Sequence, residues 1–337
     1  MQRLVKILFE YLKRQKIVLL KFLKIFFKNF YKVQLRIFWG LLGKSFSIKA
    51  NDSFEEIGWS LNHLQTNWGD LLVREVAEKY FDMRLIYTSF SGAVFGGSML
   101  GTDLYESASK IANSKPYLAI SCGVKNPIKP TWIPENLKIV GVRGYKTKEL
   151  LPEAKVVGDP GMLAPILFNL EPSIGRKVRK IFIPHISDNS KPYGTNYEIF
   201  KTNLSFGRSS LDLLKVINNS GFILAGSLHA GICAYACGTP FSFYRGNNKE
   251  NLFKYHDFAS AHNFQVHFNE DFETGISWIL ANDNIQKPTT IEQFMVYDDS
   301  LDSYSRYTRN EIYALVRQFN NKRNEIFKRK MGELEKI

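Results

Sequence analysis

The chain of 337 residues is poor in cysteine and has no long uncharged apolar run. Its three cysteines, Cys122, Cys233 and Cys237, lie in apolar segments without the CxxC spacing of a zinc or redox site, which favours buried thiols in a reducing compartment. No segment reaches the roughly 20 apolar residues of a membrane-spanning helix, and lysines within the first apolar stretch disfavour a signal peptide. We therefore expect a cytoplasmic protein.

Acidic residues are almost absent from residues 1–49, where Glu10 stands against twelve lysines and arginines. This segment carries +11 of the formal net charge of +13, so the remaining 288 residues are close to neutral. A basic charge that is confined to one segment does not indicate a body that binds nucleic acid, and we expect no nucleic-acid partner.

Basic residues recur in this segment at steps of three and four, which predicts one charged stripe on a helix. They are Lys21, Lys24, Lys28, Lys32 and Arg36. A phenylalanine-rich face lies mainly opposite, so we predict a basic amphipathic helix that binds anionic lipid peripherally at the inner face of the cell membrane. Two alternatives are a helix docked on the body with a solvated basic face, and an RNA-binding segment.

The rest of the chain alternates short apolar runs with helical patterns, which predicts an α/β fold with parallel sheets. The expected strands are residues 85–87, 93–95, 117–121, 138–142, 155–157, 181–184, 221–225 and 241–244. The expected helices are residues 71–81, 103–112, 147–151, 211–218 and 228–237. A helical pattern over residues 305–337 predicts one or two further helices that pack back on the first domain.

These elements form two series, which predicts two α/β domains that face each other across a cleft. We place the first domain at residues 50–170, the second at 171–300 and the C-terminal helices at 301–337, after the basic segment 1–49. Ligands of open parallel sheets bind beyond the carboxyl ends of the strands, so the loops that follow strands are the candidate sites.

Several loops of the first series carry residues with useful chemistry. NWGD at 67–70 precedes a helix and suits an anion or a sugar hydroxyl, unless Asp70 merely caps its own helix. FGGSML at 95–100 is a second loop of close backbone approach. Arg143 in VGVRGYKT is suited to grip a carboxylate or phosphate, or forms a surface salt bridge. Asp159 in VVGDPGM is either a turn former or a base.

The second series holds the clearest pattern, AGSLHAGICAYACGTP at 225–240. There Ser227 is expected to cap a helix and His229 to lie in its first turn, where the helix dipole disfavours the charged imidazole unless an anion is bound. His185 follows another strand in IPHISD, and NKENLFKYHDF supplies two candidate cations, Lys249 and Lys254.

In this order, NWGD, the glycine pair after a strand, VRG, VVGDPGML, IPHISD, SLHAGICAYACGTP and KYHDFAS resemble the polysaccharide pyruvyl transferase family, and its exopolysaccharide ketal-pyruvate type above all. The resemblance covers residues 67–260, and seven ordered motifs are far more specific than any one of them. It implies a GT-B-like pair of Rossmann-type domains, phosphoenolpyruvate as donor and a pair of saccharide hydroxyls as acceptor. We expect neither a metal nor another cofactor, because no group of histidine, cysteine and aspartate has the spacing of metal ligands.

The resemblance also implies two sets of binding residues. The donor set is Arg143, Ser227, Leu228, His229 and either Lys249 or Lys254. The acceptor set is Asn67, Gly69, Asp70, Gly97, Ser98 and His185. Some family members have arginine in place of Ser227, so this chain lacks one possible contact to an anion.

Phosphoenolpyruvate carries a phosphate and a carboxylate, so its site needs cations, an acid for C3 and a base for the attacking hydroxyl. Arg143 and the lysine meet the first need; His229 is the acid or the phosphate ligand, and His185 or Asp70 is the base. We expect a pyruvyl transferase of cell-surface or exopolysaccharide biosynthesis with a lipid-linked acceptor. The alternatives are a GT-B-like glycosyltransferase that uses a nucleotide sugar, and a non-catalytic module that binds polyanions through its N-terminus.

Overall fold

The computed structural model describes residues 65–101, 104–105, 115–124, 127–175, 178–194, 196–205, 209–246, 252–282 and 290–337. These residues belong to one compact unit, Glu55–Ile337. The predicted amphipathic segment, residues 1–49, lies outside the described residues, and so does Lys249.

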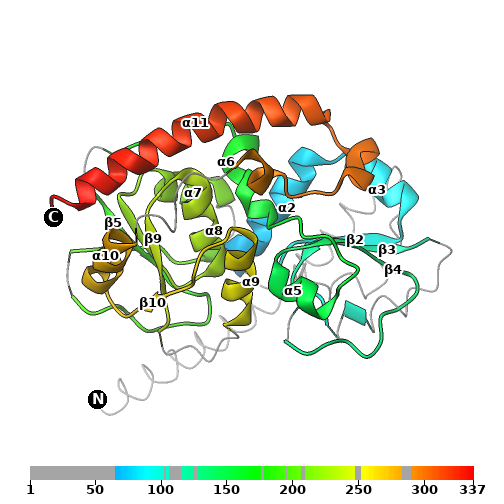
Figure 1. Cartoon of the computed structure of the whole chain (residues 1–337), viewed down its shortest axis with the longest axis horizontal. Coiled ribbons are helices and arrows are strands. Elements are labelled where there is room, and N and C mark those ends of the chain that lie inside the picture. Colours follow the sequence, from blue (N-terminus) through cyan, green and yellow to red (C-terminus); the bar gives the residue numbers. More distant parts are fainter. Residues whose placement is uncertain are drawn as a thin grey trace, which may run out of the picture. The chain divides into compact units, whose positions relative to one another are not determined.

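A three-stranded parallel sheet forms the first half of the described chain (Figure 1). Its order is β2 (Gly92–Phe95), β3 (Tyr117–Cys122) and β4 (Leu137–Val142). Every residue of β2 and β3 is buried, as expected for apolar strands that are covered on both faces. The helices of this half are α2 (Trp68–Tyr80), α3 (Met83–Ser89) and α5 (Tyr145–Leu150).

A five-stranded parallel sheet forms the second half, in the order β10-β9-β8-β5-β6. In chain order these strands are β5 (Lys180–Ile183), β6 (Glu198–Ile199), β8 (Phe222–Ala225), β9 (Phe241–Tyr244) and β10 (Phe268–Asn269). The accompanying helices are α7 (Ser210–Asn218), α8 (Leu228–Cys237), α9 (Phe253–Ala261) and α10 (Phe272–Ala281). The predicted α/β fold with parallel sheets is thus confirmed, whereas a GT-B arrangement around a cleft stays a prediction.

The two halves share a hydrophobic core. It contains Phe95 and Ile120 of the first sheet together with Ile183 and Ala225 of the second. All ten residues of α8 are buried in or beside this core, because an almost uniformly apolar helix has no face to present to water. The short helices η2 (Pro160–Leu163) and α6 (Ala164–Leu167) pack between α2 and α8. A further connection is the antiparallel pair β1 (Gln65–Asn67) and β7 (Asn203–Ser205).

The chain ends in one long helix, α11 (Arg309–Leu334), which follows η4 (Ile291–Phe294) and η5 (Asp299–Tyr304). A capping box fixes its start, because the side chains of Thr308 and Glu311 each bond the other's backbone N–H. The helix contacts both α6, which lies in the predicted first domain, and α10, which lies in the second (Figure 1). The segment before it also reaches the first half, where Arg306 Nε donates to the carbonyl oxygen of Phe81 at 2.8 Å.

Two of the predicted elements differ from the structure, and a third is described only in part. Residues 85–87 lie inside α3 and form no strand, because Asp82 caps a helix by accepting from Arg84 N at 3.0 Å. The strand predicted at 155–157 is reduced to an isolated bridge between Val156 and Val142. Of the helix predicted at 103–112, only residues 104–105 are described, and both are helical. Short apolar runs have no period of their own, which explains the error at 85–87.

Candidate active site

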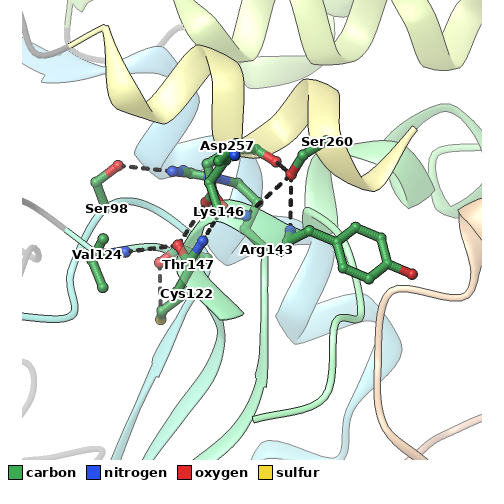
Figure 2. Close-up of polar contacts among 10 residues, drawn as sticks. Ser98, Cys122, Val124, Arg143, Lys146, Thr147, Asp257 and Ser260 are labelled. Atoms are coloured by element: carbon green, nitrogen blue, oxygen red, sulfur yellow. Dashed lines mark hydrogen bonds and ion pairs between the residues drawn. The ribbon is translucent and has the colours of Figure 1, made fainter. Parts of the chain in front are cut away.

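Arg143 follows β4 and is fully buried. Its Nε lies 3.1 Å from Asp257 Oδ2 of α9, and its Nη2 donates to Ser98 Oγ at 3.2 Å (Figure 2). The surface salt bridge considered as an alternative is therefore wrong, since the ion pair is internal. Nη1 has no acceptor among the residues that the structure describes. The guanidinium thus keeps one terminal nitrogen for a further partner.

His229 lies in the first turn of α8 with 8% of its surface exposed. Its Nε2 is buried and has no hydrogen-bond partner in the described part of the chain. On the other side, a Cβ added at Gly69 would overlap Nδ1 of the ring. The glycine of NWGD is therefore explained by the imidazole that packs against it, and the turn and the histidine belong to one site.

Four charged side chains act on His229. Burial is the main cause that lowers the pKa of the imidazole, and the positive charges of Arg143 and Lys254 lower it further. The carboxylates of Asp159 and Asp70 oppose this effect. These charges come from VRG, KYHDF, GDPG and NWGD, and His229 itself comes from SLHAG. The charged residues of four motifs therefore act on the histidine of a fifth. A bound anion would add negative charge and favour the protonated ring.

Asp159 is fully buried at the start of η2, where its Oδ1 accepts from Gly161 N at 2.9 Å. The carboxylate therefore forms a turn, which was one of the two roles predicted for Asp159. Its Oδ2 has no partner among the described residues, and neither has the buried hydroxyl of Tyr297. Burial raises the pKa of Tyr297, and the charge of Asp159 adds to this shift. Nothing in the sequence pointed to Tyr297.

The NWGD turn is held together by its own side chains. Asn67, not Asp70, caps α2, because Asn67 Oδ1 accepts from Gly69 N at 3.2 Å. Asp70 lies in the first helical turn, and its Oδ2 accepts from Asn67 Nδ2 at 3.0 Å. The interpretation of Asp70 as a helix cap is thus wrong, and its exposed carboxylate is available for another role.

The loop after β2 approaches Arg143. Gly97 adopts a left-handed conformation with φ 71°, and its carbonyl oxygen accepts from Gly123 N at 2.8 Å. The next residue, Ser98, accepts from the guanidinium as described above. The expected acceptor contacts of Gly97 and Ser98 stay predictions, but the structure places Ser98 Oγ next to Arg143.

The remaining predicted residues lie at the ends of β5 and β8 and on α9. Ser227 occupies the N-cap position of α8, although its side chain makes no capping hydrogen bond, and Leu228 packs in the core. The backbone N of His185 approaches Gly226, and its Nδ1 lies 2.9 Å from Ser187 Oγ. Lys254 lies over the ring of Tyr255, 5.3 Å from its centroid. Binding roles for these residues stay predictions.

Two further observations concern the described residues only. They contain no group of three or more histidines, cysteines and acids that is placed to hold a metal ion. They also contain no helix with the length and apolar character needed to span a bilayer.

Comparison with known proteins gives one result. A family model described as polysaccharide pyruvyl transferase matches residues 2–248 of the chain. The matched range includes Arg143, Asp159 and His229, whereas α9 with Lys254 and Asp257 lies beyond it. No curated protein and no solved structure matches the chain.

Proposed function

The chain belongs to the polysaccharide pyruvyl transferase family, and on this premise we propose that it transfers the enolpyruvyl group of phosphoenolpyruvate to two hydroxyls of a glycan. The product is a cyclic pyruvate ketal, and inorganic phosphate is released. The observation that carries this proposal is the convergence of Arg143, Lys254 and two carboxylates on the buried imidazole of His229.

The donor fits the charges of this cluster. Arg143 Nη1 and the ammonium group of Lys254 are suited to its phosphate and carboxylate, and Lys249 stays the alternative lysine. The described cluster also contains Asp70, Asp159 and Asp257, so it is not a simple positive pocket. We propose that the anionic donor is a further partner of Arg143 and Lys254 beside these carboxylates.

His229 is the proposed acid. A nitrogen of the imidazolium gives its proton to C3 of the donor, the C2–C3 π electrons form the new C–H bond, and C2 becomes electron-deficient. The first acceptor hydroxyl adds to C2 and passes its proton to a base. Phosphate then leaves with the electron pair of the C2–O bond and takes the proton held by the base. The second hydroxyl adds to C2, which closes the ketal, and returns a proton to the imidazole of His229. Asp159 and Asp70 favour the proton on His229, which supports this role over that of a phosphate ligand alone.

Asp70 and His185 are the two candidates for the base. Asp70 belongs to the cluster, because its charge acts on His229 and its carboxylate is exposed. His185 lies at the end of β5 with its Nδ1 next to Ser187. We therefore favour Asp70 as the base and assign His185 to the acceptor side.

Phosphate release tests the proposed reaction. The purified full chain is incubated with phosphoenolpyruvate and glycans that present neighbouring hydroxyl pairs, and the ketal methyl group is followed by NMR. We expect phosphate and ketal in equal amounts. Release of nucleotide from a nucleotide sugar, with no phosphate from phosphoenolpyruvate, would instead establish the glycosyltransferase alternative.

We further propose that residues 1–49 hold the enzyme at an anionic membrane surface, where a lipid-linked acceptor is concentrated. The support is the spacing of the lysines and arginines in the sequence, which predicts a charged stripe opposite a phenylalanine-rich face if the segment is helical. Flotation of the full chain with anionic vesicles should weaken as salt is added and fail when Lys24, Lys28 and Lys32 are changed to Glu. Salt-insensitive binding would contradict the electrostatic part of this proposal.

A further inference from the structure

Asp257 makes more contacts to the first half of the chain than a single ion pair requires. It lies in α9 and is fully buried. Its Oδ2 accepts from Arg143 Nε at 3.1 Å and from Thr147 Oγ1 at 2.9 Å, and its Oδ1 accepts from Thr147 N at 2.7 Å (Figure 2). One carboxylate of the second half thus fixes both the donor-side arginine and the start of α5.

Glycines lie where Arg143 and Asp257 approach the backbone most closely. A Cβ added at Gly123 would overlap Nη2 of Arg143 and lie 2.9 Å from Asp257 Oδ2. A Cβ added at Gly144 would overlap the backbone carbonyl oxygen of Asp257. Two glycines, one after β3 and one after β4, therefore admit the guanidinium and the helix that carries its partner.

The contacts of Arg143 orient its guanidinium. Asp257 occupies Nε and Ser98 occupies Nη2, so the group is held along one edge. No described residue accepts from Nη1 at the opposite end. A planar guanidinium that is fixed along one edge presents its free end in a single direction.

We propose that Asp257 is a positioning residue that aims Nη1 of Arg143 at an anionic group of the phosphoenolpyruvate donor. This inference rests on the proposed function and deepens it. Asp257 also keeps the buried guanidinium paired while the site is empty, because an unpaired charge inside a protein is strongly unfavourable. The donor therefore meets an arginine that is already ordered and loses little conformational freedom on binding.

A merely structural role is the competing explanation, because Asp257 also joins α9 to α5. Ser260 allows the two roles to be separated. Its Oγ accepts from Tyr145 N at 2.8 Å and donates to the carbonyl oxygen of Asp257 at 2.6 Å, so it joins the same helices (Figure 2). None of its hydrogen bonds goes to Arg143. Ser260→Ala is thus a matched control that weakens the helix contact alone.

The test measures KM for phosphoenolpyruvate and KM for the acceptor separately in the full-length enzyme. Asp257→Asn should raise the donor KM about tenfold or more and leave the acceptor KM within about twofold, because a charge-assisted hydrogen bond to Arg143 is lost. Ser98→Ala should raise the donor KM by a smaller factor, and Ser260→Ala should lower Tm without changing the donor KM. Calorimetric binding of phosphoenolpyruvate without acceptor should follow the same order.

Two outcomes would overturn the proposal. One is that the wild type is active and Asp257→Asn has the same donor KM as the wild type. The other is that Ser260→Ala raises the donor KM as much as Asp257→Asn does. Should Asp257→Asn not fold, Ser98→Ala and Thr147→Val decide, because each removes a hydroxyl that bonds Arg143 or Asp257 and leaves the carboxylate in place. An unchanged donor KM in both would overturn the proposal as well. A wild-type enzyme that releases no phosphate from phosphoenolpyruvate would refute the proposed function instead, so the two failures are distinct.

Discussion

Arg143 and Arg323 are both fully buried, but their partners differ in kind. Arg143 pairs with the carboxylate of Asp257, whereas Arg323 of α11 donates to the carbonyl oxygen of Tyr235 at 2.7 Å and to Asn324 Oδ1 at 2.9 Å. Lys330 lies about two helical turns further along α11 and donates to Asn218 O and Thr239 Oγ1. We call Arg323, Lys330 and the nearby His262 the α11 seam. The hydrogen-bond acceptors that Arg323 and Lys330 reach among the described residues are all neutral.

The two buried histidines show the same contrast. Carboxylates oppose the effect of burial on the pKa of His229 in the candidate site. In the seam, burial and the charge of Arg323 both lower the pKa of His262, to about 3. Burial likewise lowers the pKa of Arg323 to about 10 and that of Lys330 to about 7. Neutral partners satisfy hydrogen bonds but leave the charge uncompensated, whereas carboxylates in the candidate site oppose part of the effect of burial on His229.

The largest expected effect separates the two arginines. Arg143→Met should lower kcat/KM for phosphoenolpyruvate about a hundredfold or more, because the proposed contact to the donor anion is lost. It should also cost about 3–5 kcal/mol of unfolding free energy, since Asp257 is left buried without a cation. Arg323→Met should lower stability and leave kcat/KM within about twofold. Phosphate release and urea unfolding measure the two effects.

Adding Asp257→Asn to Arg143→Met sharpens this comparison. The double variant should regain part of the lost stability but none of the lost activity, because the buried carboxylate is then neutral. An Arg323→Met enzyme as inactive as Arg143→Met would break the distinction between site and seam.

The histidines provide the second test. His229→Gln should lower kcat by about 10²-fold, because glutamine cannot deliver a proton to C3. His262→Phe is the matched change in the seam, where the ring lies against Tyr235 and Phe258, and kcat should stay near that of the wild type. Single-turnover rates with saturating donor measure the chemical step. Near-normal turnover of His229→Gln would assign the acid role to another group.

Two glycines extend the comparison to the backbone. Gly69→Ala should lower kcat by about tenfold to a hundredfold, because the new Cβ displaces the imidazole of His229. Gly332 in α11 has no atom within 4 Å of an added Cβ, so Gly332→Ala should leave kcat unchanged and add up to about 1 kcal/mol of stability. Kinetics and thermal unfolding of the pair measure this. Unchanged kcat in Gly69→Ala would show that the ring can shift without loss of function.

Sequence reasoning predicted the places of the candidate residues in the fold better than their partners. It predicted that Arg143 follows a strand and that His229 lies in the first turn of a helix, and the structure has both there, because motifs at the carboxyl ends of parallel strands have a fixed place in this kind of fold. It missed that Asp257 holds Arg143, since these residues lie 114 positions apart and meet only through the packing of α9 on α5. The cap of α2 was assigned to Asp70 instead of Asn67 because both residue types favour helix starts. Tyr297 lies outside all of the motifs, so the sequence did not indicate it.

The smallest expected effect is the pH dependence of the seam. Lys330 has a folded pKa of about 7 against an ordinary value of 10.5, so between these values the unfolded chain holds more protons and stability rises with pH. His262 has a folded pKa of about 3 against 6.5, so stability falls as the pH drops through that lower window.

Lys330→Met should reduce the slope of unfolding free energy against pH between pH 7 and 10.5, and His262→Phe should reduce it between pH 3 and 6.5. Each reduction should be about 1 kcal/mol per pH unit relative to the wild type. A wild type and a Lys330→Met variant with parallel pH profiles would mean that a negative charge compensates the ammonium group. The seam would then resemble the candidate site, and the presence of a carboxylate would no longer distinguish functional from structural burial of charge in this protein.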